Sequence, residues 1–272
     1  TVYAEGETLT PYDRIYINSE ALNSGWYLDE SYTQKKGNPT SDYVAKYKDG
    51  VLTLNNYHGG EIGISAAASG YYKIDLIGEN TITGGQRGVF IDTSNEGRVT
   101  ITSNANGKLT INASSANSVW GIACGASNSV KTTDVVIGGN AQVTINATSN
   151  GENKQVQGIH ARNVTIEDNA SVNITAKNTN NSTESQWVSG IFAKNNVTIN
   201  TDGKIEIDVS EAGGDNAYSY GIQTSNVTFP KITDMTIKWD GNGLPISPKD
   251  KVDNTTHAVN EYSIGDIGFA SY

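Results

Sequence analysis

Short segments in which apolar and polar residues alternate run through most of the chain. The clearest have the form apolar-x-apolar, such as Val-Thr-Ile at 99–101, Leu-Thr-Ile at 109–111 and Val-Val-Ile at 135–137. A period of two with β-branched residues predicts short β-strands that bury one face. No helical stretch separates these segments, so the pattern predicts an all-β fold.

A Gly-Ile or Gly-Val phrase recurs about every 33 residues from the middle of the chain onward. It begins at Gly88, Gly121, Gly158, Gly190 and Gly221. Two apolar-x-apolar segments follow each copy, so each unit predicts three strands. Three strands per unit without a helix predict a single-stranded parallel β-helix whose coils stack at ~4.8 Å. The residues after each Gly then form one buried ladder: Val89, Ile122, Ile159, Ile191 and Ile222.

The two ends of the chain lose this pattern. Residues 1–57 are rich in Tyr, and residues 238–272 lack the repeated phrase. Because the open ends of a stacked β-helix expose unpaired strand edges, atypical capping segments are expected there. We expect one structural domain of about six coils. The N-terminal cap and first strands occupy 1–57, the coils 58–237 and the C-terminal cap 238–272.

Asparagine holds two fixed places in the repeat. One lies three residues after the closing Ile of the second strand of each unit, which is the first apolar-x-apolar segment, and the other follows the repeat Gly by five residues. Stacked Asn amides can form hydrogen bonds with one another along the axis of the β-helix, and Asn tolerates the left-handed backbone conformation found in turns. We therefore interpret both sets as turn ladders rather than as a site: Asn104, Asn140 and Asn169, and Asn163, Asn195 and Asn226.

Composition narrows the possible partners. The formal charge of −10 opposes binding to nucleic acid, which needs a basic surface, and hydrophobic residues make up only 36% of the chain. No apolar run approaches the ~20 residues of a membrane-spanning helix, so we expect no membrane insertion. The single cysteine, Cys124, cannot form an internal disulfide and takes an inward position in its strand.

We expect neither a metal site nor a cofactor. The three His residues have no second His or Cys at metal-ligand spacing. Acidic pairs such as Glu167 and Asp168 belong to no repeated pattern of oxygen ligands, as a calcium site would require. The chain also has no Gly-rich loop ending in Gly-Lys-Ser/Thr and no Gly-x-Ser-x-Gly elbow.

One outward face of the Gly-Ile strands carries candidate chemistry. The residue after Ile points outward, which aligns Phe90, His160 and Phe192, with Arg162 and Lys194 two residues further on. An aromatic ring beside cationic donors suits a sugar, which offers an apolar face and polar groups. Two other interpretations remain. The group is an ordinary solvated surface, or Arg162 or Lys194 removes a proton beside a uronic carboxylate with His160 assisting.

The segments that enter the Gly-Ile strands vary most in length and carry Trp120, Trp187, Tyr218 and Tyr220. Loops on one side of a rigid scaffold are where recognition usually occurs. We therefore expect an aromatic rim beside the His160 face, with Trp187 and Tyr220 as members of the candidate site. The alternative is that these rings fold back as lids over their own loops.

Two segments carry a resemblance to a known family. They are Tyr-Lys-Asp-Gly-Val-Leu-Thr-Leu-Asn-Asn at 47–56 and Tyr-Lys-Ile-Asp-Leu-Ile-Gly-Glu-Asn-Thr-Ile-Thr at 72–83. They resemble the opening of secreted or surface proteins of gut bacteria labelled carbohydrate-binding domain-containing, over roughly residues 15–237. The resemblance implies a right-handed β-helix of the pectate-lyase-like superfamily and an extracellular or cell-surface location. β-Helix pectinases use acidic clusters or paired Asp on one outer column, where this chain has Asp92 alone.

These observations predict an exported, non-catalytic glycan-binding or adhesin-like surface module that is a monomer and binds a polysaccharide or host glycan. The alternatives are a β-helix polysaccharide lyase or glycoside hydrolase, and a passive structural spacer. The candidate ligand-binding residues are His160, Arg162, Phe192, Lys194, Phe90, Trp187 and Tyr220.

Overall fold

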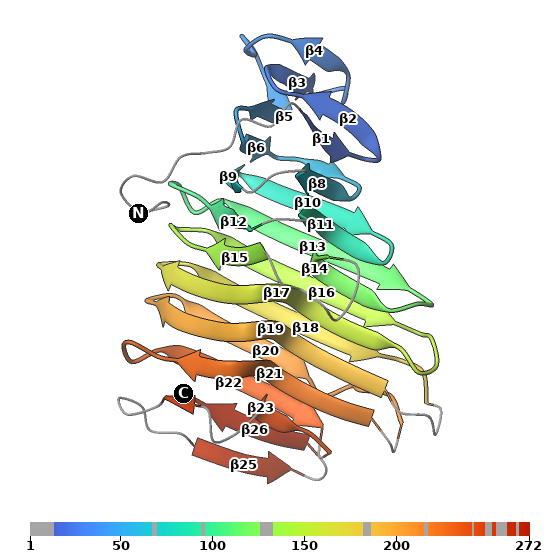
Figure 1. The fold of residues 1–272 in the computed structure, drawn as a ribbon, viewed down its shortest axis with the longest axis vertical. Coiled ribbons are helices and arrows are strands. Elements are labelled where there is room, and N and C mark those ends of the chain that lie inside the picture. The colour runs from blue at the N-terminus through green and yellow to red at the C-terminus, as the bar shows by residue number, and fades with distance from the viewer. Residues whose placement is uncertain are drawn as a thin grey trace.

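The computed structural model describes residues 14–66, 70–93, 96–125, 133–181, 186–214, 217–240, 242–247, 252–253, 260–264 and 267–272. Within these ranges every regular element is a β-strand. Most of the strands stack in parallel into a β-solenoid of about five turns (Figure 1). The predicted all-β parallel β-helix is therefore confirmed. None of the described residues forms a helix long and apolar enough to span a membrane.

The coils build three parallel stacks of strands. Stack 1 contains β8 (Ile62–Ala66), β11 (Arg87–Thr93), β14 (Val119–Cys124) and the first halves of β17 (Gln155–Asp168), β19 (Gln186–Thr201) and β21 (Ala217–Thr228). Stack 2 contains β6 (Val51–Asn55), β9 (Gly70–Ile77), β12 (Gly97–Thr102), β15 (Thr133–Ile137) and the second halves of β17, β19 and β21. Stack 3 contains β7 (His58–Gly59), β10 (Glu79–Gly84), β13 (Lys108–Ser115), β16 (Gln142–Ser149), β18 (Ser171–Asn178), β20 (Lys204–Val209) and β22 (Asp234–Asp240).

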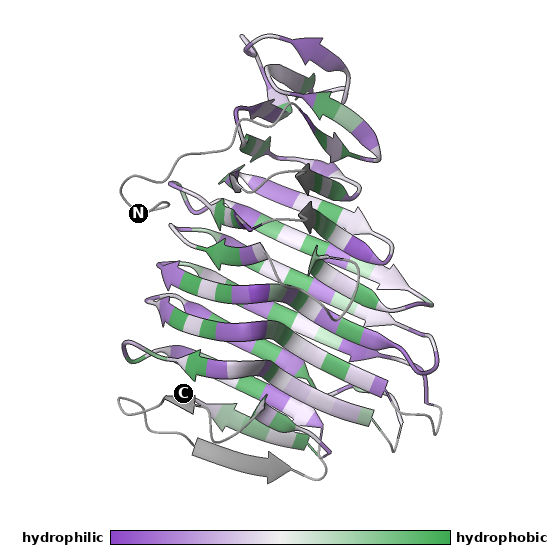
Figure 2. Ribbon diagram, in the orientation of Figure 1, coloured by the Kyte–Doolittle hydropathy of each residue, from purple (hydrophilic) through white to green (hydrophobic). Residues whose placement is uncertain are grey.

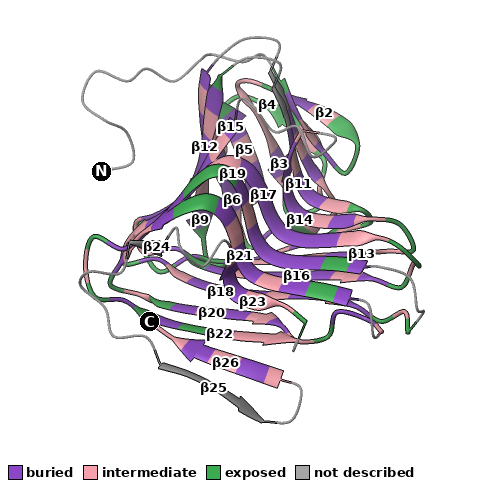
Figure 3. Cartoon of the chain, turned by 60° about the horizontal axis from the view of Figure 1, so that its bottom comes forward, coloured by how far each residue is buried: buried purple, intermediate pink, exposed green. Residues whose placement is uncertain are grey.

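In the later turns one continuous strand passes from stack 1 to stack 2. Figure 3 shows the bend in β17 and β19, and their register shifts there. The shift pairs Asn163 with Asn196, which in turn pairs with Asn226. The backbone N–H and the side-chain amide of Asn196 donate to Oδ1 of Asn163 at 3.1 and 3.2 Å. The prediction of Asn195 in this ladder was therefore wrong by one residue, because constant spacing from the Gly ignores the bulge.

The core is a set of apolar ladders along the solenoid axis. Figure 2 shows hydrophobic and hydrophilic positions alternating along the strands. The predicted ladder from Val89 to Ile222 is completely buried, with every member at 0% exposure. Burying a Val or Ile side chain stabilises the fold by ~1.5 to 3 kcal/mol, so each added coil contributes its own share.

The repeated glycine is the point where stack 1 lies directly against stack 3. A Cβ added to Gly158 would lie 2.4 Å from Cγ2 of Ile174 and 2.5 Å from the carbonyl oxygen of Gly190. Both distances are shorter than real Cβ contacts, so only glycine allows this approach. The same pairing recurs in the other turns: Gly88 with Ile111, Gly121 with Ile145, Gly190 with Ile207 and Gly221 with Ile237.

Antiparallel strands lie at both ends, where the sequence predicted atypical capping segments. The N-terminal cap contains β1 (Arg14–Ile17), β2 (Glu20–Asn23), β3 (Trp26–Asp29), β4 (Gln34–Lys36) and β5 (Tyr43–Lys48). At the other end β26 (Ile267–Ser271) pairs antiparallel with β22 and with β25 (Asn260–Ile264). Parallel stacking extends beyond the predicted coil limits of 58–237. It begins at β6 and continues through β23 (Leu244–Ser247) and β24 (Val252–Asp253), which pair with β21.

Candidate functional site

The face predicted from the sequence lies on the outer side of stack 1. Strand register aligns Phe90, Ala123, His160, Phe192 and Gln223 in one column, as expected from the repeat. Phe90, Phe192 and Gln223 are half-buried, so the column faces outward. His160, however, is only 1% exposed. The expectation that its imidazole faces solvent was wrong, because neighbouring aromatic rings enclose it.

The surroundings of His160 are aromatic. Its ring centroid lies 5.1 Å from that of Phe192 and 6.3 Å from that of Trp120. Nε1 of Trp120 donates to Oε1 of Gln157 at 3.1 Å, and Nδ1 of His160 lies 2.5 Å from the same oxygen. Since an indole N–H only donates, the Gln157 atom facing it is the carbonyl oxygen, and Nδ1 of His160 must carry a proton to donate to it. The buried His160 ring therefore packs against the more exposed rings of Trp120 and Phe192.

Arg162 is held by carboxylates. Its Nε and Nη2 donate to the two oxygens of Asp134 at 2.7 and 2.9 Å, and Nη1 donates to Glu96 at 3.1 Å. The hydrogen bonds to Asp134 are the main reason that the pKa of Arg162 is raised. A guanidinium paired with two carboxylates and with a raised pKa is a poor base, so the geometry does not favour the proton-abstraction role.

The remaining cationic and aromatic candidates do not converge on His160. Lys194 is exposed and lies in the register shift of β19, where its carbonyl oxygen accepts a hydrogen bond from Ser225. Phe90 lies two turns away in β11, and the guanidinium of Arg87 covers its ring at 3.8 Å from the centroid. The side chain of Asp92 lies outside the described residues.

Aromatic side chains do gather on this side of stack 1. Trp120, Trp187, Tyr218 and Tyr220 lie in strands β14, β19 and β21 rather than in the loops where the sequence suggested them. Trp187 and Tyr218 are register partners on adjacent turns and are 40% and 42% exposed. Burial raises the pKa of Tyr220, which is half-buried. We call the four residues together with Phe192 the aromatic face.

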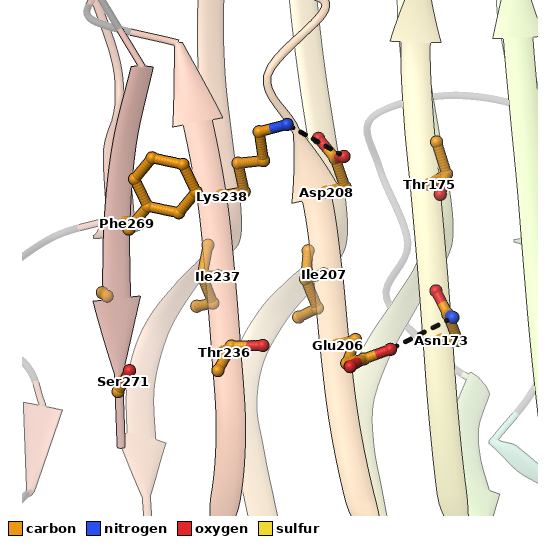
Figure 4. Close-up of a pocket in the computed structure, with 11 residues that line it drawn as sticks. Asn173, Thr175, Glu206, Ile207, Asp208, Thr236, Ile237, Lys238, Phe269 and Ser271 are labelled. Atoms are coloured by element: carbon orange, nitrogen blue, oxygen red, sulfur yellow. Dashed lines mark hydrogen bonds and ion pairs between the residues drawn. The ribbon is translucent and has the colours of Figure 1, made fainter. Parts of the chain in front are cut away.

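A groove on the outer side of stack 3 was not predicted. It has a volume of about 480 Å³ and crosses β18, β20, β22 and β26 (Figure 4). Two rows of outward side chains border it. One row is Asn173, Glu206, Thr236 and Ser271, and the other is Thr175, Asp208, Lys238 and Phe269. Because stack 1 packs on stack 3, this groove and the aromatic face point in opposite directions.

Ion pairs and hydrogen bonds connect the groove residues. Nζ of Lys204 lies 2.7 Å from Glu206, and this contact raises the pKa of Lys204. Nζ of Lys238 lies 3.9 Å from Asp208, and the amide of Asn173 donates to Glu206 at 3.4 Å. The sequence held a usable signal, because the residue after the closing Ile of these stack 3 segments carries charge only in the last two coils, as Asp208 and Lys238.

Other chemistry finds little support in the described part of the chain. No group of three or more His, Cys, Asp or Glu side chains there is arranged to hold a metal ion. Cys124 is buried, and burial raises the pKa of its thiol, which fits its predicted place in the core.

The fold and these two faces define the class: a capped, all-β parallel β-solenoid. Comparison with known proteins adds no closer identification, since no family model, no curated protein and no solved structure matches the chain. The resemblance to the gut-bacterial family therefore stays a prediction.

Proposed function

We propose that this chain is a non-catalytic glycan-binding module that acts as a monomer outside the cell or on its surface. The aromatic face carries the proposal. Trp187 and Tyr218, side by side on adjacent turns, are both large and both about two-fifths exposed. Paired exposed rings of this kind are typical of interaction sites rather than of ordinary protein surface. The extracellular location rests on the family resemblance of the sequence.

The chemistry of the face suits a sugar. Flat rings stack on the apolar face of a pyranose, while the tyrosine hydroxyls and nearby Gln155 and Gln223 can hydrogen-bond its polar edge. Because the rings project from strands of one continuous sheet, little conformational freedom is lost on binding. The net charge of −10 argues against a nucleic acid as the ligand.

The experiment is binding of the purified chain to an array of host and plant glycans. We expect the double variant Trp187→Ala, Tyr218→Ala to lose about 5- to 100-fold in affinity, since each ring contributes ~0.5 to 1.5 kcal/mol. Ile77→Ala is the matched control, because Ile77 is 42% exposed and lies in β9, away from the face. Full retention by the double variant would refute this face as the site. Absence of any glycan ligand would favour the spacer or a protein adhesin.

One observation favours a second candidate, a glycoside hydrolase. Glu206 and Asp208 lie two residues apart on β20, so their side chains point to the same side and both border the groove. Paired carboxylates are the catalytic groups of glycosidases. Incubation with polysaccharides and an assay for new reducing ends tests it. If the native chain releases reducing ends and the Glu206→Gln variant does not, the protein is a glycoside hydrolase. If no bound glycan yields reducing ends, the hydrolase is refuted and the glycan-binding role stands.

A further inference from the structure

We propose that the groove on stack 3 is a second ligand site, which binds an uncharged oligosaccharide lying along the solenoid axis. It shares no residue with the aromatic face and lies on the opposite side of the molecule. The proposal therefore goes beyond the function assigned to that face.

The shape of the groove favours an extended ligand. Next to the hollow of about 480 Å³ lies a second hollow of about 200 Å³ over β16, β18 and β20. The two share Asn173 and Glu206, so they join into one strip that runs from β16 to β26. Neighbouring strands are ~4.8 Å apart, so a strip over five strands is ~19 Å long, which suits several sugar units in a row.

The widest part of the strip has the features of a sugar subsite. Phe269 lines this part of the strip together with the short side chains of Thr236 and Ser271, and Nζ of Lys238 lies 5.9 Å from the centroid of its ring (Figure 4). Lys238 and Asp208 continue the row from Phe269. A pyranose in this space would stack on the ring and meet hydrogen-bonding groups at its edge.

The charges in the strip favour an uncharged ligand. Glu206 pairs with Lys204 at 2.7 Å, and Asp208 pairs loosely with Lys238 at 3.9 Å. Among the charged side chains that line the strip, two carboxylates and two ammonium groups balance, so the lining attracts neither a polyuronate nor a polycation by its net charge. A sugar hydroxyl both donates and accepts, and adjacent ammonium and carboxylate groups satisfy both roles.

The fold itself does not require these side chains. At the equivalent register positions of earlier turns stand Thr110 and Thr144 in one row and Asn112 and Asn146 in the other. The Asn146 amide donates to Oδ1 of Asn112 at 2.9 Å, so these polar groups satisfy each other. In these two rows the charged residues Glu206, Asp208 and Lys238 and the ring of Phe269 all lie near the C-terminal cap, which is why we assign a ligand to that part of the surface.

The test is calorimetric titration of the full chain with neutral hexasaccharides of glucose, mannose, xylose and N-acetylglucosamine, and with hexagalacturonate. Thr236→Trp fills the hollow from an exposed position and should abolish binding, and Phe269→Ala should weaken it about 2- to 12-fold. Thr110→Trp is the matched control, because Thr110 lies in the same column outside the groove. A thermal melt of each variant confirms folding.

We expect at least one neutral hexasaccharide to bind and hexagalacturonate not to bind. Unchanged binding in Thr236→Trp would overturn the inference, as would binding of hexagalacturonate as tight as that of the neutral ligands, or no binding of any hexasaccharide. The double variant at Trp187 and Tyr218 separates the two sites. If it abolishes all binding while Thr236→Trp has no effect, the groove is refuted and the aromatic face stands.

Discussion

Replacement of Gly158 by alanine tests the contact that sets the distance between stacks 1 and 3. The added methyl would lie 2.4 Å from Cγ2 of Ile174 and 2.5 Å from the carbonyl oxygen of Gly190. The first neighbour is a branched side chain in a close-packed core. The second is backbone in a paired strand. Neither can move aside without shifting part of a sheet, so the variant should be strongly destabilised.

The expected magnitude follows from the cost of overpacking a core, which is ~1 to 3 kcal/mol for extra methyl groups. With two contacts below 3.0 Å, one of them to backbone, we expect the upper end, about 3 kcal/mol. For a chain of this size about 1 kcal/mol lowers Tm by ~2 to 4 °C. The predicted fall in Tm is therefore ~6 to 12 °C.

Thermal unfolding followed by circular dichroism measures the effect. Gly85→Ala is the control, since a Cβ at Gly85 meets nothing within 4 Å and the change should leave Tm unchanged or slightly raised. Ile174→Ala removes the Cγ2 that clashes, so the double variant Gly158→Ala, Ile174→Ala should lose less stability than the sum of the two single changes. Equal Tm values for Gly158→Ala and the native chain, or strict additivity, would refute the reasoning.

Two further predictions concern stability. Asn163 accepts two hydrogen bonds from Asn196 and donates one to Asp134, so Asn163→Ala should lower Tm by at least ~2 to 4 °C through the loss of about 1 kcal/mol or more of hydrogen bonding. Asn195→Ala should leave Tm unchanged, and equal effects of the two changes in thermal melts would contradict the register shift. Glu167 has a pKa raised by burial and by Asp168, so its ionisation disfavours the folded state; Glu167→Gln should raise Tm at neutral pH, and the gain should vanish as pH falls and Glu167 becomes protonated. A gain that persists at low pH would refute this assignment.

The sequence predicted the fold because its information is periodic. Each unit repeats a Gly-Ile phrase and two segments of alternating apolar and polar residues. Because the phrase keeps the same place in every unit, the pattern predicts parallel coils stacked in register. The burial of Ile159 and its equivalents follows directly from this pattern. The structural reason for the glycine could not be predicted, because the contact with Ile174 depends on how two sheets that are separate in the repeat pack together.

The candidate site was harder to predict, because side-chain surroundings are set by neighbours from other turns. His160 occupies its expected column, yet Trp120 and Phe192 enclose it. Arg162 is satisfied by Asp134, which lies 28 residues earlier in sequence. Neither the burial of His160 nor the pairing of Arg162 with Asp134 can be predicted from the spacing of residues within one unit. The groove went unpredicted for a different reason, since its wall is completed by Phe269 from a strand that lies outside the repeat.

The glycine contact also bears on how such a chain can change its length during evolution. Gly158 and its partner Ile174 belong to the same turn, so one segment of DNA encodes both halves of the fit. A tandem duplication with equivalent end points therefore inserts a turn that already matches its neighbours, and lengthens the rod by one ~4.8 Å step. Such a duplication would leave the charged strip next to the C-terminal cap unchanged. The length of the solenoid and the ligand specificity of the groove can therefore vary independently.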